Sequence, residues 1–289
     1  MFNLFKSAMT SSDGQIAHKP VRNSSRLMLG VLCFFCVLTL TGAALYYFPR
    51  QNGSSDQYVS SYTPPGPLFP RASDFAKLLE EDGEEKVVTI LGDSTGNEVN
   101  EWVYLLAGKI SDGYDRPVFI HNWSVASDSY STSTRVGNSD NGLVHIWNGS
   151  VPGADARYVL EHIASLFPRP SDLIIFSLGH NYVTPQAAVQ GQSNLLTTIR
   201  REWPDSRPAI AITLQNPRLD GSSANQAAKV SALRSTYSDR ADVSIIDVWS
   251  VFVTAEEVAP LLREDGFNPS YAGQILWVDA VGRALGLGL

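Results

Sequence analysis

The chain has 289 residues, of which 44% are hydrophobic and 18% are charged, a composition typical of a folded α/β protein rather than a disordered chain. Its formal net charge is −7, but the first 48 residues carry +3, which leaves −10 for the remainder. An acidic body without a basic cluster lacks the electrostatic footprint of a nucleic-acid-binding protein, so we expect no nucleic acid partner.

Residues 27–48 form an apolar segment without a charged residue. A helix of this length spans the hydrocarbon core of a bilayer, which is about 30 Å thick. Because basic residues precede the segment and only Arg50 follows closely, the positive-inside rule places residues 1–26 in the cytoplasm and the chain after about residue 50 outside. The alternative is a cleaved signal peptide, but the apolar region of such peptides usually runs about 7–15 residues. We therefore expect a single-pass anchor, with the membrane as a partner.

The positions of the cysteines and the local composition indicate how the rest of the chain is organised. Both cysteines, Cys33 and Cys36, lie within it, so the rest of the chain has no disulfide and depends on its core for stability. Residues 49–72 are rich in Ser, Pro and Gly and lack periodicity, which indicates a flexible linker. The remaining residues, 73–289, are expected to form one domain.

Apolar and amphipathic segments alternate through this domain. Strands are predicted at 86–91, 117–121, 172–178, 209–214 and 243–247. Helices are predicted at 73–82, 95–111, 154–166, 185–202, 223–236 and 271–285. The alternation indicates a mainly parallel five-stranded sheet covered by helices on both faces, which is a three-layer α/β/α sandwich. The polar stretch 128–153 is long enough to fold over a site as a lid.

Ligands of such sheets bind at the carboxyl ends of the strands, so the residues there are the candidates for chemistry. The first strand ends in "LGDST", residues 91–95, and a Ser on a turn before a helix has an exposed hydroxyl beside unpaired helical N–H groups. Ser94 is therefore a candidate nucleophile, with helix capping as the alternative. The third strand ends in "SLGHNYV", where Asn181 offers an amide donor for an oxyanion.

A third block, "DGFNPSYAG", precedes the last predicted helix at residues 265–273. Together with "LGDST" and "GHN" it resembles the SGNH or GDSL hydrolase family over about residues 86–286. The resemblance implies a flavodoxin-like sheet. It also implies that Ser94 is the nucleophile and supplies an oxyanion N–H, that Asn181 is a second oxyanion donor, and that Asp265 orients the base. The family's second block usually holds a Gly whose N–H completes the oxyanion hole, and the alignment of "NWSVASDS" puts Ser127 there.

The serious departure from the family pattern is Asn268, which stands where the family has its catalytic His. An Asn amide accepts and donates hydrogen bonds, but it does not take a proton from a serine hydroxyl. Removal of the base from a triad leaves an acceleration of about 10³ to 10⁴ over water. His180, beside Asn181, and His145, in the predicted lid, are the candidate substitute bases. His121 and His162 are interpreted as structural.

The leading hypothesis is a membrane-anchored, extracytoplasmic SGNH-type serine esterase or acyl transferase. Its substrate would be an acyl or acetyl ester, with a cell-envelope glycan as one candidate. The alternatives are a catalytically inactive module that binds a glycan or an acylated ligand, and a structural partner in an envelope complex. No G-x-G-x-x-G phosphate loop follows the first strand. We expect neither a metal nor a cofactor.

Overall fold

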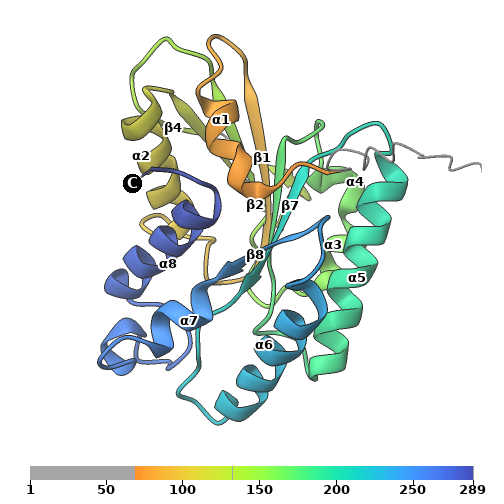
Figure 1. Ribbon diagram of the computed structural model, residues 1–289, viewed down its shortest axis with the longest axis vertical. Helices are drawn as coiled ribbons and strands as arrows, with labels where there is room; N and C mark the ends of the chain where they lie inside the picture. Colours follow the sequence, from red (N-terminus) through yellow and green to blue (C-terminus); the bar gives the residue numbers. More distant parts are fainter. Residues whose placement is uncertain (1–68, 132, 289) are drawn as a thin grey trace, which may run out of the picture. The chain divides into compact units, whose positions relative to one another are not determined.

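The computed structural model describes residues 69–131 and 133–288. The predicted tail at 1–26, the predicted anchor at 27–48 and most of the predicted linker lie outside these residues. Within the described part, no helix combines the length and the apolar character needed to cross a bilayer. The described residues form an α/β domain in which helices cover both faces of a mainly parallel sheet (Figure 1).

Six parallel strands make up most of the sheet. In spatial order they are β2 (Val118–Ser124), β5 (Val144–Asn148), β1 (Lys86–Gly92), β6 (Leu173–Ser177), β7 (Ala209–Leu214) and β8 (Ser244–Asp247). Two short strands, β3 (Ser129–Tyr130) and β4 (Thr134–Val136), pair antiparallel with β2. Strands β1, β6 and β7 are buried along their whole length, because helices cover both of their faces.

Strand β5 corrects two predictions. The sheet has a sixth parallel strand in addition to the five predicted, and this strand lies between β2 and β1. It comes from the stretch 128–153, which therefore forms part of the sheet and not a lid. The pattern of β5 alternates, with Val144 and Ile146 buried and His145 and Trp147 half-buried. Apart from this insertion, the strand order is the predicted flavodoxin-like one.

The helices fall into two layers (Figure 1). One face of the sheet is covered by α1 (Phe75–Leu79), α2 (Trp102–Tyr114), α7 (Val248–Val253) and α8 (Tyr271–Ala284). The other is covered by α3 (Ala156–Glu161), α4 (Ile163–Leu166), α5 (Pro185–Glu202) and α6 (Ser223–Tyr237). Two short 3-10 helices complete the elements, η1 (Ala72–Asp74) and η2 (Ala259–Leu261). The predicted helix at 154–166 is thus divided in two at His162.

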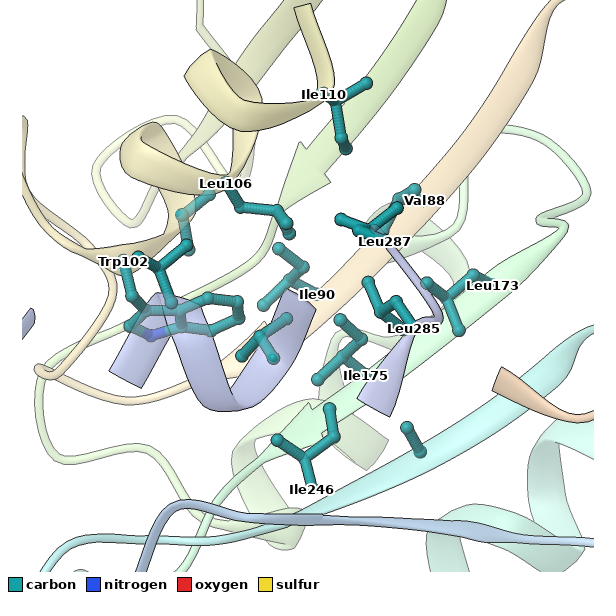
Figure 2. Packing of buried hydrophobic residues seen from close by; sticks show 14 of the residues in the cluster. Val88, Ile90, Trp102, Leu106, Ile110, Leu173, Ile175, Ile246, Leu285 and Leu287 are labelled. Carbon is teal, nitrogen blue, oxygen red and sulfur yellow. The ribbon is translucent and has the colours of Figure 1, made fainter. Parts of the chain in front are cut away.

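Side chains alternate between the two faces of each central strand and create two hydrophobic clusters. Figure 2 shows one of them, in which Val88 and Ile90 of β1 pack beneath Trp102 and Leu106 of α2. The Trp102 ring also stacks on Trp277 of α8, with ring centroids 6.1 Å apart. Burial of these aromatic and aliphatic groups is the main favourable term that fixes α2 and α8 on the sheet.

The described residues begin slightly before the predicted domain boundary at residue 73. Ala72 is fully buried, and its N–H donates to the Ser244 hydroxyl at 3.1 Å. Ser244 is the first residue of β8. The described chain therefore enters the domain at the amino-terminal edge of the sheet, whereas the strand ends expected to carry chemistry lie at the opposite edge.

Candidate active site

The turn after β1 presents Ser94 as a half-exposed side chain and fixes its neighbour Asp93 in the interior. The Asp93 carboxylate accepts hydrogen bonds from the Thr95 N–H at 3.1 Å and the Thr95 hydroxyl at 2.8 Å. It also accepts one from the Gln215 amide at 2.9 Å. A buried carboxylate with three donors is held firmly, so the backbone on both sides of Ser94 has a defined conformation.

The environment of Ser94 differs from the prediction in one respect. The expected helix at 95–111 begins only at Trp102, with Glu101 as its N-cap residue. The helical N–H groups therefore do not adjoin the Ser94 hydroxyl. Donors for an anion at this serine must come from the turn itself and from neighbouring loops.

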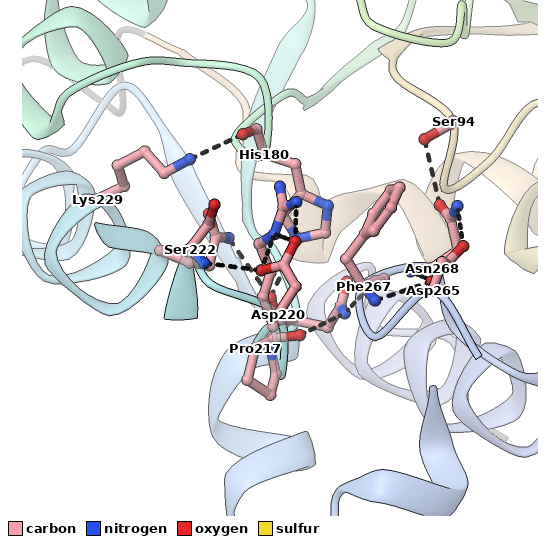
Figure 3. Close-up of polar contacts among 12 residues, drawn as sticks. Ser94, His180, Pro217, Asp220, Ser222, Lys229, Asp265, Phe267 and Asn268 are labelled. Carbon is pink, nitrogen blue, oxygen red and sulfur yellow. Dashed lines mark hydrogen bonds and ion pairs between the residues drawn. The ribbon is translucent and has the colours of Figure 1, made fainter. Parts of the chain in front are cut away.

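Ser94, Asn268 and Asp265 form a continuous hydrogen-bonded chain (Figure 3). The Ser94 hydroxyl donates to Oδ1 of Asn268 at 3.2 Å, and Nδ2 of Asn268 donates to Oδ2 of Asp265 at 2.8 Å. Because an ionised carboxylate only accepts, the amide nitrogen must face Asp265 and the amide oxygen must face Ser94. Asn268 thus takes the place that the resemblance assigns to a base, and it orients the hydroxyl without being able to remove its proton.

The loop that carries Asp265 and Asn268 is closed by several hydrogen bonds. Oδ1 of Asp265 accepts from the N–H groups of Phe267 and Asn268, each at 2.9 Å. Partial desolvation raises the pKa of Asp265, but these N–H groups and the Asn268 amide outweigh it and hold the pKa below its ordinary value. Arg263 braces the loop, because its N–H donates to the Asn268 carbonyl at 2.8 Å and its guanidinium pairs with buried Glu101 at 2.9 Å.

Asn181 lies on the loop after β6 and contacts the turn that follows β5. Its Nδ2 donates to the Ala154 carbonyl at 3.0 Å, which leaves its second N–H for another acceptor. The turn in question packs on the end of β1, because the Val151 N–H donates to the Gly92 carbonyl at 3.1 Å. A Cβ at Gly92 would come within 2.4 Å of the Ser150 hydroxyl, so only glycine permits this close approach.

Gly153 lies between Val151 and Ala154 and has a φ of 80°, a conformation that favours glycine. Its N–H is at the edge of the sheet that carries Ser94 and Asn181. Because it precedes Ala154, the acceptor of the Asn181 amide, Gly153 is a further candidate for an oxyanion N–H beside Ser127. The signal in the sequence was "NGSVPG" at 148–153, which directly follows the alternating segment "LVHIW".

Ser127 does not fit the role that the alignment gave it. It is exposed in the turn between β2 and β3, and its N–H donates to the Ser124 carbonyl at 3.3 Å. Strand β5 separates β2 from β1, so this turn is one strand removed from the end of β1. The turn that contains Gly153 instead follows β5, which is the neighbour of β1.

His180 is not placed to act as the substitute base. The residue is buried, its Nε2 donates to the Asn216 carbonyl at 3.1 Å, and burial lowers the pKa of its imidazole. In Figure 3 the Phe267 ring lies between this imidazole and Ser94. The hydrogen bond of the Ser94 hydroxyl goes to Asn268 instead.

The other histidines lie away from this chain of hydrogen bonds. His145 in β5 bonds to His121 in β2, with 3.0 Å between Nδ1 and Nε2. Nδ1 of His162 lies 2.8 Å from the Tyr158 carbonyl, where α3 gives way to α4. Among residues 69–131 and 133–288, no group of three or more His, Cys, Asp or Glu side chains is placed to hold a metal ion.

Fold and site together define a class of protein. An α/β sandwich with a serine after its first strand, a hydrogen-bonded partner before its last helix and a carboxylate behind that partner is the scaffold of a serine hydrolase. The family model described as GDSL-like Lipase/Acylhydrolase matches residues 88–281, and the chain belongs to this family. The resemblance to the SGNH or GDSL hydrolases is thereby confirmed.

Solved structures of this fold are similar to the chain at low sequence identity. One is a carbohydrate esterase of family 3 from Talaromyces cellulolyticus, at 21% identity and a TM-score of 0.53, covering 69% of this chain and 96% of that one. An acetylxylan esterase from Geobacillus stearothermophilus gives 14% identity and a TM-score of 0.50 over 71% and 95%. An α/β hydrolase enzyme from the metagenome of Lake Arreo, Spain, gives 15% and 0.51 over 71% and 97%. Comparison with curated proteins gave no significant match.

Proposed function

We propose that this member of the family is a serine esterase or acyl transferase that acts on an acyl or acetyl ester, with Ser94 as the nucleophile. The observation that carries the proposal is the hydrogen-bonded chain from the Ser94 hydroxyl through Asn268 to Asp265. A structural serine does not need a partner whose orientation is itself fixed by a carboxylate. The presence of this chain of hydrogen bonds, with an amide at its centre, supports a site for chemistry on the serine hydroxyl.

In the proposed reaction, Oγ of Ser94 attacks the ester carbonyl carbon and the carbonyl oxygen becomes an oxyanion. The N–H groups of Ser94 and Gly153 and the Asn181 amide would stabilise that charge. The bond from the carbonyl carbon to the alkoxy oxygen then breaks, and an acyl-enzyme and an alcohol result. Water or a sugar hydroxyl subsequently takes the acyl group. Asn268 holds the Ser94 hydroxyl in place, and the hydroxyl proton passes to solvent or to the leaving oxygen, so turnover is expected to be slow.

Two features bear on the substrate. The loops after β1, β2, β6 and β7 each present an aliphatic side chain that is more than half exposed: Val99, Val125, Val183 and Leu219. We take these four side chains as candidate contacts for an acyl group, because all of them lie on loops at the carboxyl ends of the strands. Two similar structures are named as a carbohydrate esterase and an acetylxylan esterase, so acetylated glycans belong among the substrates to be tested.

A second candidate function is a catalytically inactive module that binds a glycan or an acylated ligand. The observation that favours it is the fixed orientation of Asn268, whose amide offers a half-exposed hydrogen-bonding group where a base is expected. Neither His180 nor His145 is hydrogen-bonded to Ser94: Nε2 of His180 donates to the Asn216 carbonyl, and Nδ1 of His145 lies 3.0 Å from Nε2 of His121.

The substitution Asn268→His separates the two candidates. One nitrogen of an imidazole there would donate its N–H to the Asp265 carboxylate, and the other would accept the hydrogen bond of the Ser94 hydroxyl. If only the base is missing, hydrolysis of p-nitrophenyl acetate should rise at least about 10-fold, since general-base assistance is typically worth about 10² to 10⁴. The gain should follow an imidazole-like pKa in a pH profile.

Controls decide how this experiment is read. The gain must vanish when Ser94→Ala is combined with Asn268→His, and a serine-directed phosphonate should label the wild-type chain but not Ser94→Ala. A wild type as fast as Asn268→His would mean that another base is in use. Absence of turnover in both forms, together with glycan or acyl-ligand binding by the wild type, would support the binding module.

The location is part of the proposal. We infer from the apolar segment at 27–48 that a single-pass anchor holds the domain outside the cytoplasm.

A further inference from the structure

Lys229 of α6 is a buried lysine that contacts the loop of Asn181. Its side chain lies in the interior, with the residue only 1% exposed. Its Nζ donates to the His180 carbonyl at 2.9 Å, as drawn in Figure 3, and to the Tyr182 carbonyl at 3.2 Å. These two carbonyls belong to the residues on either side of Asn181, so one ammonium group binds the main chain of both neighbours of Asn181.

The same loop is held from a second direction. The His180 N–H donates to Oε1 of Gln215 at 2.7 Å, and the amide nitrogen of Gln215 donates to Asp93 at 2.9 Å, beside Ser94. Gln215 thereby connects the loop to the serine turn, while Lys229 connects it to α6. The loop of Asn181 is thus fixed through both its N–H and its carbonyl groups.

A buried ammonium is a costly way to satisfy two carbonyls. Both of its acceptors are main-chain oxygens and neither is a carboxylate. Burial lowers the pKa of Lys229 to about 8, and the positive charge of Arg218 acts in the same direction against the attraction of Asp93 and Asp220. A neutral donor would satisfy the carbonyls at a lower desolvation cost, so the charge itself requires an explanation.

We propose that Lys229 is a positioning residue whose ammonium group holds the Asn181 amide in the geometry needed to receive an oxyanion. The role assigned to Asn181 rests on the proposed function. Loss of the positive charge would weaken both hydrogen bonds at once, because charge-assisted hydrogen bonds are roughly twice as strong as neutral ones. The loop would then be free to move relative to Ala154, the present acceptor of the Asn181 amide.

Four titratable or charged groups lie near Lys229. Arg218 and Asp220 approach it from the loop after β7, Asp93 from the turn after β1 and His180 from the loop after β6. Lys229 is the group among them whose pKa lies at about 8. A transition of the Asn181 loop near that pH is therefore the signature of Lys229.

The test uses the full chain labelled with ¹⁵N in its asparagine side chains and followed by NMR from pH 6 to pH 10. The Asn181 amide signal is identified by its disappearance in Asn181→Asp. In the wild type it should shift with a midpoint near pH 8. In Lys229→Met, the Asn181 amide signal at pH 7 should differ in chemical shift from the wild-type signal and should not change with pH. In Lys229→Arg, the signal should keep the chemical shift that the wild type has at pH 7, up to pH 10.

A second measurement reports on function. The rate of phosphonate labelling of Ser94 at pH 7 should fall about 10-fold in Lys229→Met, less than the loss of about 10² to 10³ that accompanies removal of an oxyanion donor. Lys229→Arg should retain most of the rate. Lys109→Met is the matched control, because Lys109 pairs with Asp279 in the contact of α2 with α8 and should leave signal and rate unchanged.

The outcomes distinguish the two levels of the proposal. A wild-type Asn181 signal that titrates as expected, without any labelling of Ser94, would refute the proposed function and leave the positioning role intact. A signal that does not change between pH 6 and pH 10 in the wild type would overturn the positioning role, even if Lys229→Met fails to fold. Equal loss of labelling in Lys229→Met and Lys109→Met would also overturn it.

Discussion

At the scale of single residues, Asn268 lies between Ser94 and Asp265 and has a side-chain hydrogen bond to each. The amide preserves both hydrogen bonds of an imidazole, one toward Asp265 and one toward Ser94. What it cannot preserve is basicity, because an amide oxygen accepts a hydrogen bond but remains unprotonated near neutral pH. Asp265 is therefore retained with an orienting task, and its lowered pKa keeps it ionised for that task.

This orienting task leads to a prediction about Asp265. In the Asn268→His background, Asp265→Asn should remove most of the gained activity, a loss of about 10² to 10⁴, because the introduced imidazole would lose the carboxylate that selects its tautomer. Hydrolysis of p-nitrophenyl acetate measures the loss, and a thermal melt checks that the fold persists. The idea would be wrong if the double variant kept the activity of Asn268→His.

The sequence predicted which residues would meet, and failed where tertiary packing decides the direction of a side chain. Ser94, Asp265 and Asn268 come together because the carboxyl end of β1 and the start of α8 meet at one edge of the sheet. His180 is a candidate base in the sequence, yet Gln215 binds its backbone N–H and the Asn216 carbonyl accepts from its ring inside the protein. No local pattern could have revealed this, because both partners come from the loop after β7.

At the scale of elements, the strands with continuous apolar runs were predicted and β5 was not. Strands β6 and β7 lie between two layers of helices and read as unbroken hydrophobic segments. Strand β5 is short, and every second residue of it is half-buried. Its pattern and its polar surroundings made it look like part of a loop. Without β5, the turn that holds Gly153 could not be placed next to the end of β1.

Strands β2 and β5 also carry a pair of stacked histidines, His121 and His145, that should make the domain sensitive to acid. Burial and the neighbouring His145 lower the pKa of His121 from 6.5 to about 4, and burial also lowers that of His145. The unfolded chain thus binds more protons than the folded chain between these values. The contribution of neutral His121 to the free energy of unfolding is fully present above pH 6.5. It is lost as the pH falls toward 4, and the loss is on the order of 2 kcal/mol.

The variant His121→Phe tests this dependence. Phenylalanine can keep the stacking on Trp147, whose ring centroid lies 3.9 Å from that of His121, and it does not titrate. Urea unfolding at pH 7 and pH 4.5 should show a smaller difference in the free energy of unfolding for His121→Phe than for the wild type. An equal difference in both proteins would assign the acid sensitivity to other groups.

At the scale of the whole molecule, different groups lie at the carboxyl edge of the sheet, where the parallel strands end, and at the amino edge, where they begin. The carboxyl edge gathers Ser94, Asn181, Asn268 and the exposed aliphatic side chains. The amino edge receives the chain where η1 meets the start of β8. The described chain therefore enters the domain at the end of the sheet opposite Ser94.

The last prediction concerns removal of residues 1–62. Both clusters of buried hydrophobic residues lie within residues 72–287, so the fragment 63–289 should fold alone and remain soluble. The full chain should stay with membranes after salt and carbonate washing, and a reporter fused after residue 60 should be accessible from outside. Phosphonate labelling of Ser94 should proceed at the same rate in both forms, because Ser94 and its partners Asn268 and Asp265 all lie within the fragment. A full chain recovered as a shortened soluble product would favour the cleaved signal peptide, and a slower fragment would show that residues 1–62 contribute to the site.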